Sequence, residues 1–324
     1  MLLRSEIKVN PPADQINLKD PVLLTGSCFS ENIGSLLSSC KFNVLVNPFG
    51  TLYNPHSIFR LMLSAAKENF ELPETDIVFN QGIYRCLGFH SAISGKDMPD
   101  LKEKGREAFH RSSDFLRKNK WIILTLGTSI VYVYKKTGEI VANCHKLPAD
   151  NFQRQFMQVD DIVAGFSELH AALNGINPEI KFILTVSPVR HLNEGFDDNQ
   201  VSKSILRLAC DRIARQFSGI NYFPAYEIMI DDLRDYRFYS DDLVHPNSLA
   251  VQYIWEKFNA AYFDYETREF VRAWSKILKA LSHRPFNPGS SEYKEFVKNT
   301  IEKLKSFGDK VNVGPEIEQL NDQL

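Results

Sequence analysis

The sequence predicts an α/β fold with a largely parallel central sheet, and two observations carry this prediction. Four short segments are apolar and rich in β-branched residues and do not alternate with polar ones, which is typical of strands buried on both faces. Helical patterns separate these segments, and strands that alternate with helices build parallel sheets covered by helices. At 324 residues, with 44% hydrophobic and 24% charged residues, the chain has globular composition and can form one large or two smaller domains.

The elements follow one another in a regular order. The predicted core strands are 22–25, 42–46, 121–126 and 182–186, and each runs into a turn. Helical patterns cover 31–39, 55–69, 100–119, 159–173 and 200–216. The most apolar stretch, 121–134, is too short to span a bilayer and reads as a buried strand with its following turn.

Two regions break this alternation. Residues 76–91 predict a hairpin around Asn80-Gln81-Gly82, inserted between the second and third core strands. After the helical pattern 250–263, two charged helices are expected over 266–281 and 290–307, followed by a polar, loosely ordered tail over 308–324. Capping of a site, packing on the sheet and dimer formation all remain open for these helices.

Charge and cysteine content exclude several classes of protein. Lys+Arg 38 against Asp+Glu 40 gives 38 − 40 = −2, which argues against nucleic-acid binding or a polybasic membrane surface. The five cysteines are odd in number and form no CxxC pair, so a reduced compartment is the simpler interpretation. The N-terminus lacks an apolar signal-peptide core, and we expect a cytoplasmic protein without a membrane span.

Ligands of open α/β sheets bind at the carboxyl ends of the strands, so the turns there hold the candidate site residues. The polar and small residues in these turns are Ser27, Asn47, Gly50, Thr128, Ser129, Ser187, Arg190 and His191.

The first of these turns, 25–34, joins a buried strand directly to a helix. Ser27 falls at the helix N-terminus, where free N–H groups and the positive end of the dipole stabilise an anion, including a developing oxyanion. Serine is also a preferred N-cap, and for this turn taken alone capping is the favoured interpretation. The turn matches neither GxGxxG nor GxxxxGK[ST], which gives nucleotide binding little support.

A second informative segment, 239–250, holds Asp242 and His245 three residues apart, just before an apolar helix. A serine nucleophile needs a base, and an imidazole base needs a carboxylate that fixes its tautomer. One short loop could supply both groups. The same spacing also arises by chance in a helix-entry loop.

Taken together, the two segments resemble the SGNH/GDSL hydrolase superfamily, and further motifs resemble its GSCFA family over roughly residues 1–263. Gly26-Ser-Cys-Phe-Ser30 differs from the GSCFA signature at its last position alone. The other similar segments are 47–55 (NPFGTLYNP), 124–128 (LTLGT), 142–146 (ANCHK), 187–191 (SPVRH), 222–227 (YFPAYE) and 237–246.

The resemblance implies a three-layer, flavodoxin-like sandwich over 1–263, with 264–324 as a C-terminal helical extension. It also implies that Ser27 is the nucleophile, His245 the base and Asp242 the orienting carboxylate. Cys28 is the rival nucleophile, and we interpret it as a small buried residue. Asp241 is the alternative acid, but its spacing to His245 is off by one.

By the same resemblance, the Ser27 and Gly50 N–H groups form an oxyanion hole. The superfamily's third donor, an Asn in a GxN turn, is missing from Gly127-Thr-Ser129. Thr128 is preferred in its place, with Ser129, Asn47 and Asn143 as alternatives.

The remaining candidate site residues are His145, Arg190 and His191, as contacts to the substrate. Arg190 would suit a carboxylate or phosphate. No histidine pair has metal-site spacing, and neither a metal nor another cofactor is expected.

The sequence therefore predicts a serine esterase acting on a small-molecule or carbohydrate ester, with an O-acetyl sugar as the default. An acyltransferase on the same site, a non-catalytic carbohydrate- or protein-binding module and a Cys28-dependent activity are the alternatives. The oligomeric state stays open.

Overall fold

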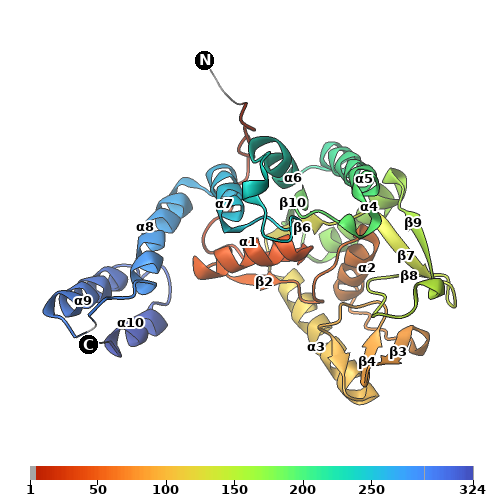
Figure 1. Ribbon diagram of the computed structural model, residues 1–324, viewed down its shortest axis with the longest axis horizontal. Coiled ribbons are helices and arrows are strands. Elements are labelled where there is room, and N and C mark those ends of the chain that lie inside the picture. Colours follow the sequence, from red (N-terminus) through yellow and green to blue (C-terminus); the bar gives the residue numbers. More distant parts are fainter. Residues whose placement is uncertain (1–4, 288, 324) are drawn as a thin grey trace.

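The computed structural model describes residues 5–287 and 289–323, and its centre is a five-stranded parallel sheet in the order β11-β10-β6-β1-β2 (Figure 1). These strands are β1 (Val22–Gly26), β2 (Val44–Val46), β6 (Trp121–Leu126), β10 (Lys181–Val186) and β11 (Ile220–Tyr222). The α/β prediction and its four core strands are confirmed. The fifth strand, β11, has three residues and was not predicted, because so short a run carries little pattern of its own.

Helices cover both faces of this sheet and make it the middle of three layers. One face packs on α2 (Pro55–Ala66), α3 (Met98–Leu116), α4 (Val159–Ile176) and α5 (Phe196–Gln216). The other packs on α1 (Cys28–Ser39) and α7 (Ser248–Tyr262). Successive residues of a strand point to opposite faces. In β6, accordingly, Ile122 and Leu124 join the first core and Trp121 and Ile123 the second.

The predicted hairpin is confirmed as β3 (Ile77–Asn80) and β4 (Ile83–Cys86), to which β5 (Ser94–Gly95) adds a third antiparallel strand. A second small sheet was not predicted. It contains β7 (Ile130–Tyr134), β8 (Glu139–Val141) and β9 (Phe152–Phe156), with β7 in the middle. The centre of β9 is Gln-Arg-Gln, a polar run that becomes a strand through its pairing with β7.

The C-terminal extension folds into α8 (Tyr265–Leu281), α9 (Ser291–Lys305) and α10 (Gly314–Asn321), which project to one side of the sheet (Figure 1, blue). The expected loose tail is wrong for α10, because Leu320 is buried and Glu316 pairs with Lys41. The indole Nε1 of Trp274 donates to the Ser39 carbonyl at 2.8 Å, so α8 packs against the end of α1.

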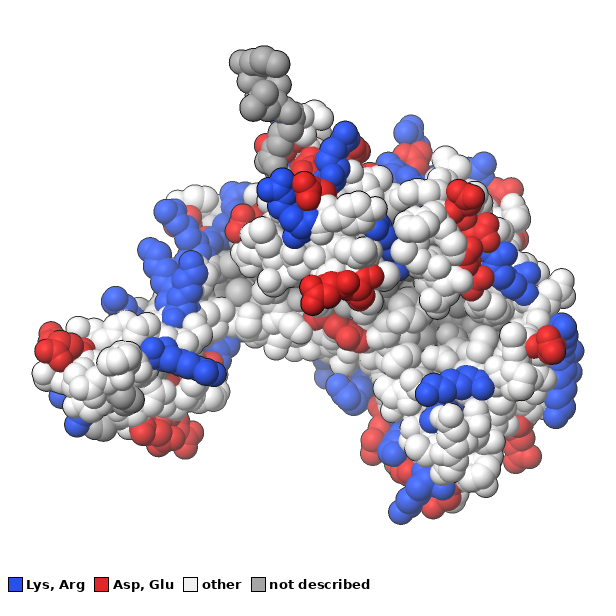
Figure 2. Space-filling model, in the orientation of Figure 1, with Lys and Arg blue, Asp and Glu red and all other residues white. Residues whose placement is uncertain are grey.

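On the face seen in Figure 2, acidic and basic side chains are interspersed, in keeping with the near-neutral charge balance. Within residues 5–287 and 289–323, the structure contains no helix with the length and apolar character needed to cross a membrane.

Candidate active site

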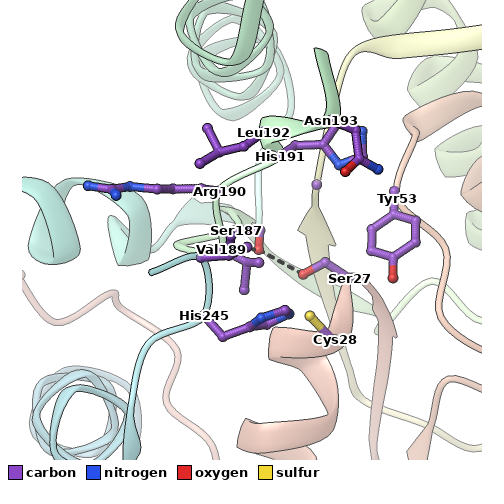
Figure 3. A pocket seen from close by; sticks show the side chains of 12 residues that line it. Ser27, Cys28, Tyr53, Ser187, Val189, Arg190, His191, Leu192, Asn193 and His245 are labelled. Atoms are coloured by element: carbon purple, nitrogen blue, oxygen red, sulfur yellow. Dashed lines mark hydrogen bonds between the residues drawn. The ribbon is translucent and has the colours of Figure 1, made fainter. Parts of the chain in front are cut away.

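A pocket of about 260 Å³ opens at the carboxyl ends of the three central strands (Figure 3). Its lining includes Ser27, Gly127 and Ser187, the residues that directly follow β1, β6 and β10. The loop before α7 contributes His245. This is the edge at which open α/β sheets bind their ligands.

Ser27 caps α1, as predicted: the Phe29 N–H donates to its Oγ at 3.3 Å. The hydroxyl of Ser27 also donates to the Oγ of Ser187 at 2.9 Å. The residue is 1% exposed, yet it lines the pocket, so its oxygen is shielded from bulk water but open to a bound molecule. Capping and a chemical role are therefore compatible.

The loop before α7 holds Asp242 and His245 together. Nδ1 of His245 lies 2.6 Å from Oδ2 of Asp242. Since a carboxylate can only accept, Nδ1 carries a proton, and in the neutral imidazole Nε2 then keeps its lone pair. Oδ1 of Asp242 accepts from the backbone N–H groups of Val244 and His245 at 2.9 and 3.0 Å. These backbone bonds, followed by that to the imidazole, lower the pKa of Asp242 to about 2.

Arg190 lines the pocket and also secures this loop. Its backbone N–H and its guanidinium donate to the carbonyls of Val244 and Leu243, at 3.2 and 3.1 Å. The guanidinium lies 4.0 Å from the ring centre of Tyr239 and points away from Ser27 (Figure 3). Backbone and aromatic partners thus engage this group, and its contact to an anionic substrate stays a prediction.

His191 does line the pocket, with its ring 6.2 Å from that of Tyr53. Burial, and then the charge of Lys203, lower the pKa of His191, which favours the neutral imidazole. Together with Asn193 these side chains form an uncharged, partly aromatic wall (Figure 3).

Cys28 also lines the pocket, next to Ser27. Burial, and then the nearby Glu31 carboxylate, raise the pKa of its thiol. A nucleophilic cysteine needs a lowered pKa, because the thiolate is the reactive form. The electrostatics therefore disfavour Cys28 as the nucleophile.

Three of the predicted oxyanion residues, Gly50, Asn47 and Thr128, are not among the residues that line this pocket. The Gly50 N–H donates to the Asn47 carbonyl at 2.8 Å, and both residues line a different hollow beside α1. The Asn47 side chain bridges the Gly26 N–H and Glu31. The Thr128 hydroxyl is bonded to that of Ser202 at 2.9 Å. The Gly50 N–H, the Asn47 side chain and the Thr128 hydroxyl are therefore already hydrogen-bonded within the protein.

Asn143 and His145 also lie outside the pocket, in the loop after β8. The Asn143 side chain accepts from the His145 N–H at 2.8 Å, and Nε2 of His145 lies 2.8 Å from the Cys86 carbonyl. His145 is buried there and is not among the residues that line the pocket.

Lys203 of α5, which was not among the predicted site residues, lies behind the pocket and is 1% exposed. Its Nζ donates to the carbonyls of Gly127 and Ser187, both at 2.8 Å. A signal was present: Lys203 falls on the same helix face as the buried Leu206, Cys210 and Ile213. Burial lowers the pKa of Lys203 to about 7.

This lysine makes stability depend on pH. Between about pH 7 and 10.5 the unfolded chain binds a proton that the folded lysine has released, so the free energy of unfolding rises with pH. Relative to Lys203→Met, the wild type should gain about 1 kcal/mol per pH unit in this window, measured by urea unfolding at pH 6.5, 8 and 9.5.

The titratable groups with which Lys203 interacts are Cys28 and His191, and it lies 5.6 Å from the Tyr226 ring. Cys28 and His191 are present in both the wild type and Lys203→Met, so to first order they affect the two free energies of unfolding alike. The difference between the two proteins then reports the titration of Lys203. If the free energies of unfolding of the wild type and Lys203→Met change by the same amount from pH 6.5 to 9.5, Lys203 has the same pKa in the folded and unfolded states.

Among residues 5–287 and 289–323 there is no group of three or more His, Cys, Asp or Glu side chains that could hold a metal ion. The pocket brings together a buried hydroxyl, a carboxylate-bonded imidazole, a thiol, the Arg190 guanidinium and neutral hydrogen-bonding groups.

Comparison with known proteins gives both a family and distant structural likenesses. The chain is 11% identical to a carbohydrate esterase family 3 from Talaromyces cellulolyticus, over 79% of this chain and 99% of that one, with a TM-score of 0.35. It is 11% identical to an acetyl xylan esterase from the rumen bacterium Butyrivibrio proteoclasticus, over 82% and 66% of the two chains, with a TM-score of 0.37. TM-scores this low do not establish a shared function. No curated protein matches in sequence.

Two family models match most of the chain. The model of the GSCFA family covers residues 21–258, and that of the C-terminal domain of GSCFA domain proteins covers residues 274–324. The chain belongs to the GSCFA family.

Proposed function

We propose that this protein is a serine ester hydrolase of the SGNH superfamily. One observation carries the proposal: His245, bonded to Asp242 at 2.6 Å, lines the same pocket as Ser27. In this arrangement Nε2 is free to accept a proton and the carboxylate stabilises the imidazolium that results. The C-terminal extension, residues 264–324 in the proposed division, contributes no residue to the pocket lining that the structure describes.

The reaction would proceed in two stages. Ser27 Oγ attacks the ester carbonyl carbon as its proton passes to Nε2 of His245, and the carbonyl electron pair moves onto oxygen. Collapse of this intermediate expels the alkoxide, which takes the proton from His245 and leaves an acyl group on Ser27. Water, deprotonated by His245, then attacks the acyl group and restores the Ser27 hydroxyl.

The pocket favours a small acyl group on a polyhydroxy alcohol. Its volume of about 260 Å³ is at the lower end for ligand sites, which leaves little space for a long acyl chain. Tyr53, His191 and Asn193 offer aromatic and neutral polar groups, which suit a carbohydrate better than an anion. Transfer to a sugar hydroxyl in place of water would use the same residues.

Fluorophosphonate labelling tests the proposal, because the reagent forms an Oγ–P bond and loses fluoride at a serine activated by a base. We expect one adduct, mapped by peptide mass spectrometry to Ser27, and none in Ser27→Ala. Ser35→Ala, which alters an exposed serine of the same helix, should label as the wild type does. A folded wild type that takes no label would reject the serine mechanism.

A further inference from the structure

The pocket contains few hydrogen-bond donors that remain free for an oxyanion. The Ser27 N–H donates to the Thr125 carbonyl at 3.0 Å. The N–H groups of Gly127 and Thr128 both donate to the Tyr53 carbonyl, at 2.8 and 3.0 Å. The backbone amides that follow β1 and β6 are therefore engaged in holding the loops together.

Two donors beside Ser27 remain. The first is the N–H of Cys28, the first residue of α1, which has no acceptor within its own helix. The second is the hydroxyl of Ser187. Its oxygen accepts from the Ser27 hydroxyl at 2.9 Å and from the Val189 N–H at 3.3 Å. For the proton of Ser187 itself, the part of the chain that the structure describes provides no recorded acceptor.

The position of Ser187 fits the geometry of an oxyanion donor. In a tetrahedral intermediate on Ser27, the charged oxygen and Oγ are bonded to the same carbon. A donor that already lies 2.9 Å from Oγ is therefore within hydrogen-bonding reach of that charged oxygen. Ser187 is fully buried and lines the pocket beside Ser27, so its hydroxyl is shielded from bulk water but accessible to a bound molecule (Figure 3).

We propose that Ser187 is a catalytic residue that donates a hydrogen bond to the oxyanion formed on Ser27, and that Lys203 positions it. The proposal rests on the ester hydrolase function proposed above. When the ester binds, the Ser27 proton turns from Ser187 to His245, and Ser187 gives its own hydrogen bond to the carbonyl oxygen. No covalent bond of Ser187 is broken in this step.

Lys203 positions Ser187 from behind the pocket. Its two hydrogen bonds of 2.8 Å tie the carbonyl of Ser187 to that of Gly127, so the chain after β10 is fixed to the chain after β6. The N–H of Ser187 is held in turn by the Leu126 carbonyl at 2.8 Å. A neutral amine still has two N–H donors, which suffice for both carbonyls, so this arrangement persists as the lysine loses its proton.

The primary test is hydrolysis of 4-nitrophenyl acetate by Ser187→Ala. Loss of one oxyanion donor should lower kcat about 10²- to 10³-fold with little change in KM, and slow fluorophosphonate labelling of Ser27 by a similar factor. The matched control is Ser202→Ala, another fully buried serine, which bonds Thr128 and Ser129 outside the pocket lining. Its kcat should fall less than about threefold.

The positioning role is tested by a double-mutant cycle. Lys203→Met should lower kcat, and Ser187→Ala/Lys203→Met should be no slower than Ser187→Ala alone, because the lysine acts through the serine. If kcat of the double variant falls by the product of the two single factors, Lys203 does not act through Ser187 and this role is rejected. If Lys203→Met does not fold, Lys203→Gln replaces it in the same cycle.

The possible failures are distinguishable. If the wild type labels at Ser27 and Ser187→Ala keeps its kcat, or loses no more than Ser202→Ala, Ser187 is not an oxyanion donor and the hydrolase proposal stands. If the folded wild type neither labels nor hydrolyses the ester, both proposals fall together.

Discussion

His245→Ala should lower kcat for 4-nitrophenyl acetate about 10³- to 10⁴-fold, because Ser27 then has no base to take its proton. Stability should change little, since the His245 side chain is about half exposed and its one recorded side-chain hydrogen bond is to Asp242. Steady-state kinetics measured beside a thermal unfolding curve separates the two effects. If His245→Ala keeps more than about a tenth of wild-type kcat, another group serves as the base.

Asp242 and Asp241 provide a matched pair for the same question. Asp242→Asn keeps an oxygen that can accept from the Val244 and His245 N–H groups, so the loop should keep its shape while the imidazolium loses its counter-charge. We expect kcat to fall about 10²- to 10⁴-fold. Asp241→Asn makes the same change of charge at a neighbouring exposed position and should leave kcat within about twofold.

The pKa of Asp242, lowered to about 2, adds a condition to this comparison. The carboxylate stays ionised from pH 5 to 8, so the counter-charge that Asp242→Asn removes is present throughout this range. A ¹³C NMR titration in which the wild-type Asp242 carboxyl gains its proton at pH 5 or above would contradict its hydrogen bonding. If kcat falls equally in Asp241→Asn and Asp242→Asn, the loss comes from removing a negative charge from the loop and not from the hydrogen bond between Asp242 and His245.

The local arrangements that the sequence predicted around Ser27 and His245 depend on short stretches of chain. Ser27 follows a buried strand and begins a helix, and both features can be read within ten residues. Asp242 and His245 interact across three residues, in a turn that their own backbone closes. Interactions between residues this close in the chain can be predicted from the sequence.

The residues that the sequence did not reveal owe their contacts to distant parts of the chain. Lys203 reaches Gly127 across 76 residues, and a hydrogen bond between such distant segments cannot be inferred from either one. The same holds for β9, whose polar centre becomes a strand because β7 lies beside it.

Gly26→Ala should lower the free energy of unfolding more than any of the substitutions proposed above. Gly26 is the last residue of β1, pairs with Thr125 of β6 and directly precedes Ser27. Its φ of 135° is one that side chains rarely adopt, and an added Cβ would lie 2.1 Å from the Thr125 carbonyl oxygen. The neighbour is backbone of the adjacent strand, so no rotamer change can relieve the overlap. We expect a loss of about 4 kcal/mol or more in the free energy of unfolding, measured in urea.

A matched control separates strained φ from steric overlap. Gly82, at the tip of the β3–β4 hairpin, also has a positive φ, of 76°, but an added Cβ there would meet nothing within 4 Å. Gly82→Ala should cost about 1–2 kcal/mol and leave Ser27 labelling intact. In Gly26→Ala, any molecules that fold must move the Thr125 carbonyl, which also accepts the Ser27 N–H, so labelling of Ser27 should be lost as well. If both variants lose the same 1–2 kcal/mol, the close approach of β1 to β6 is not what requires glycine at position 26.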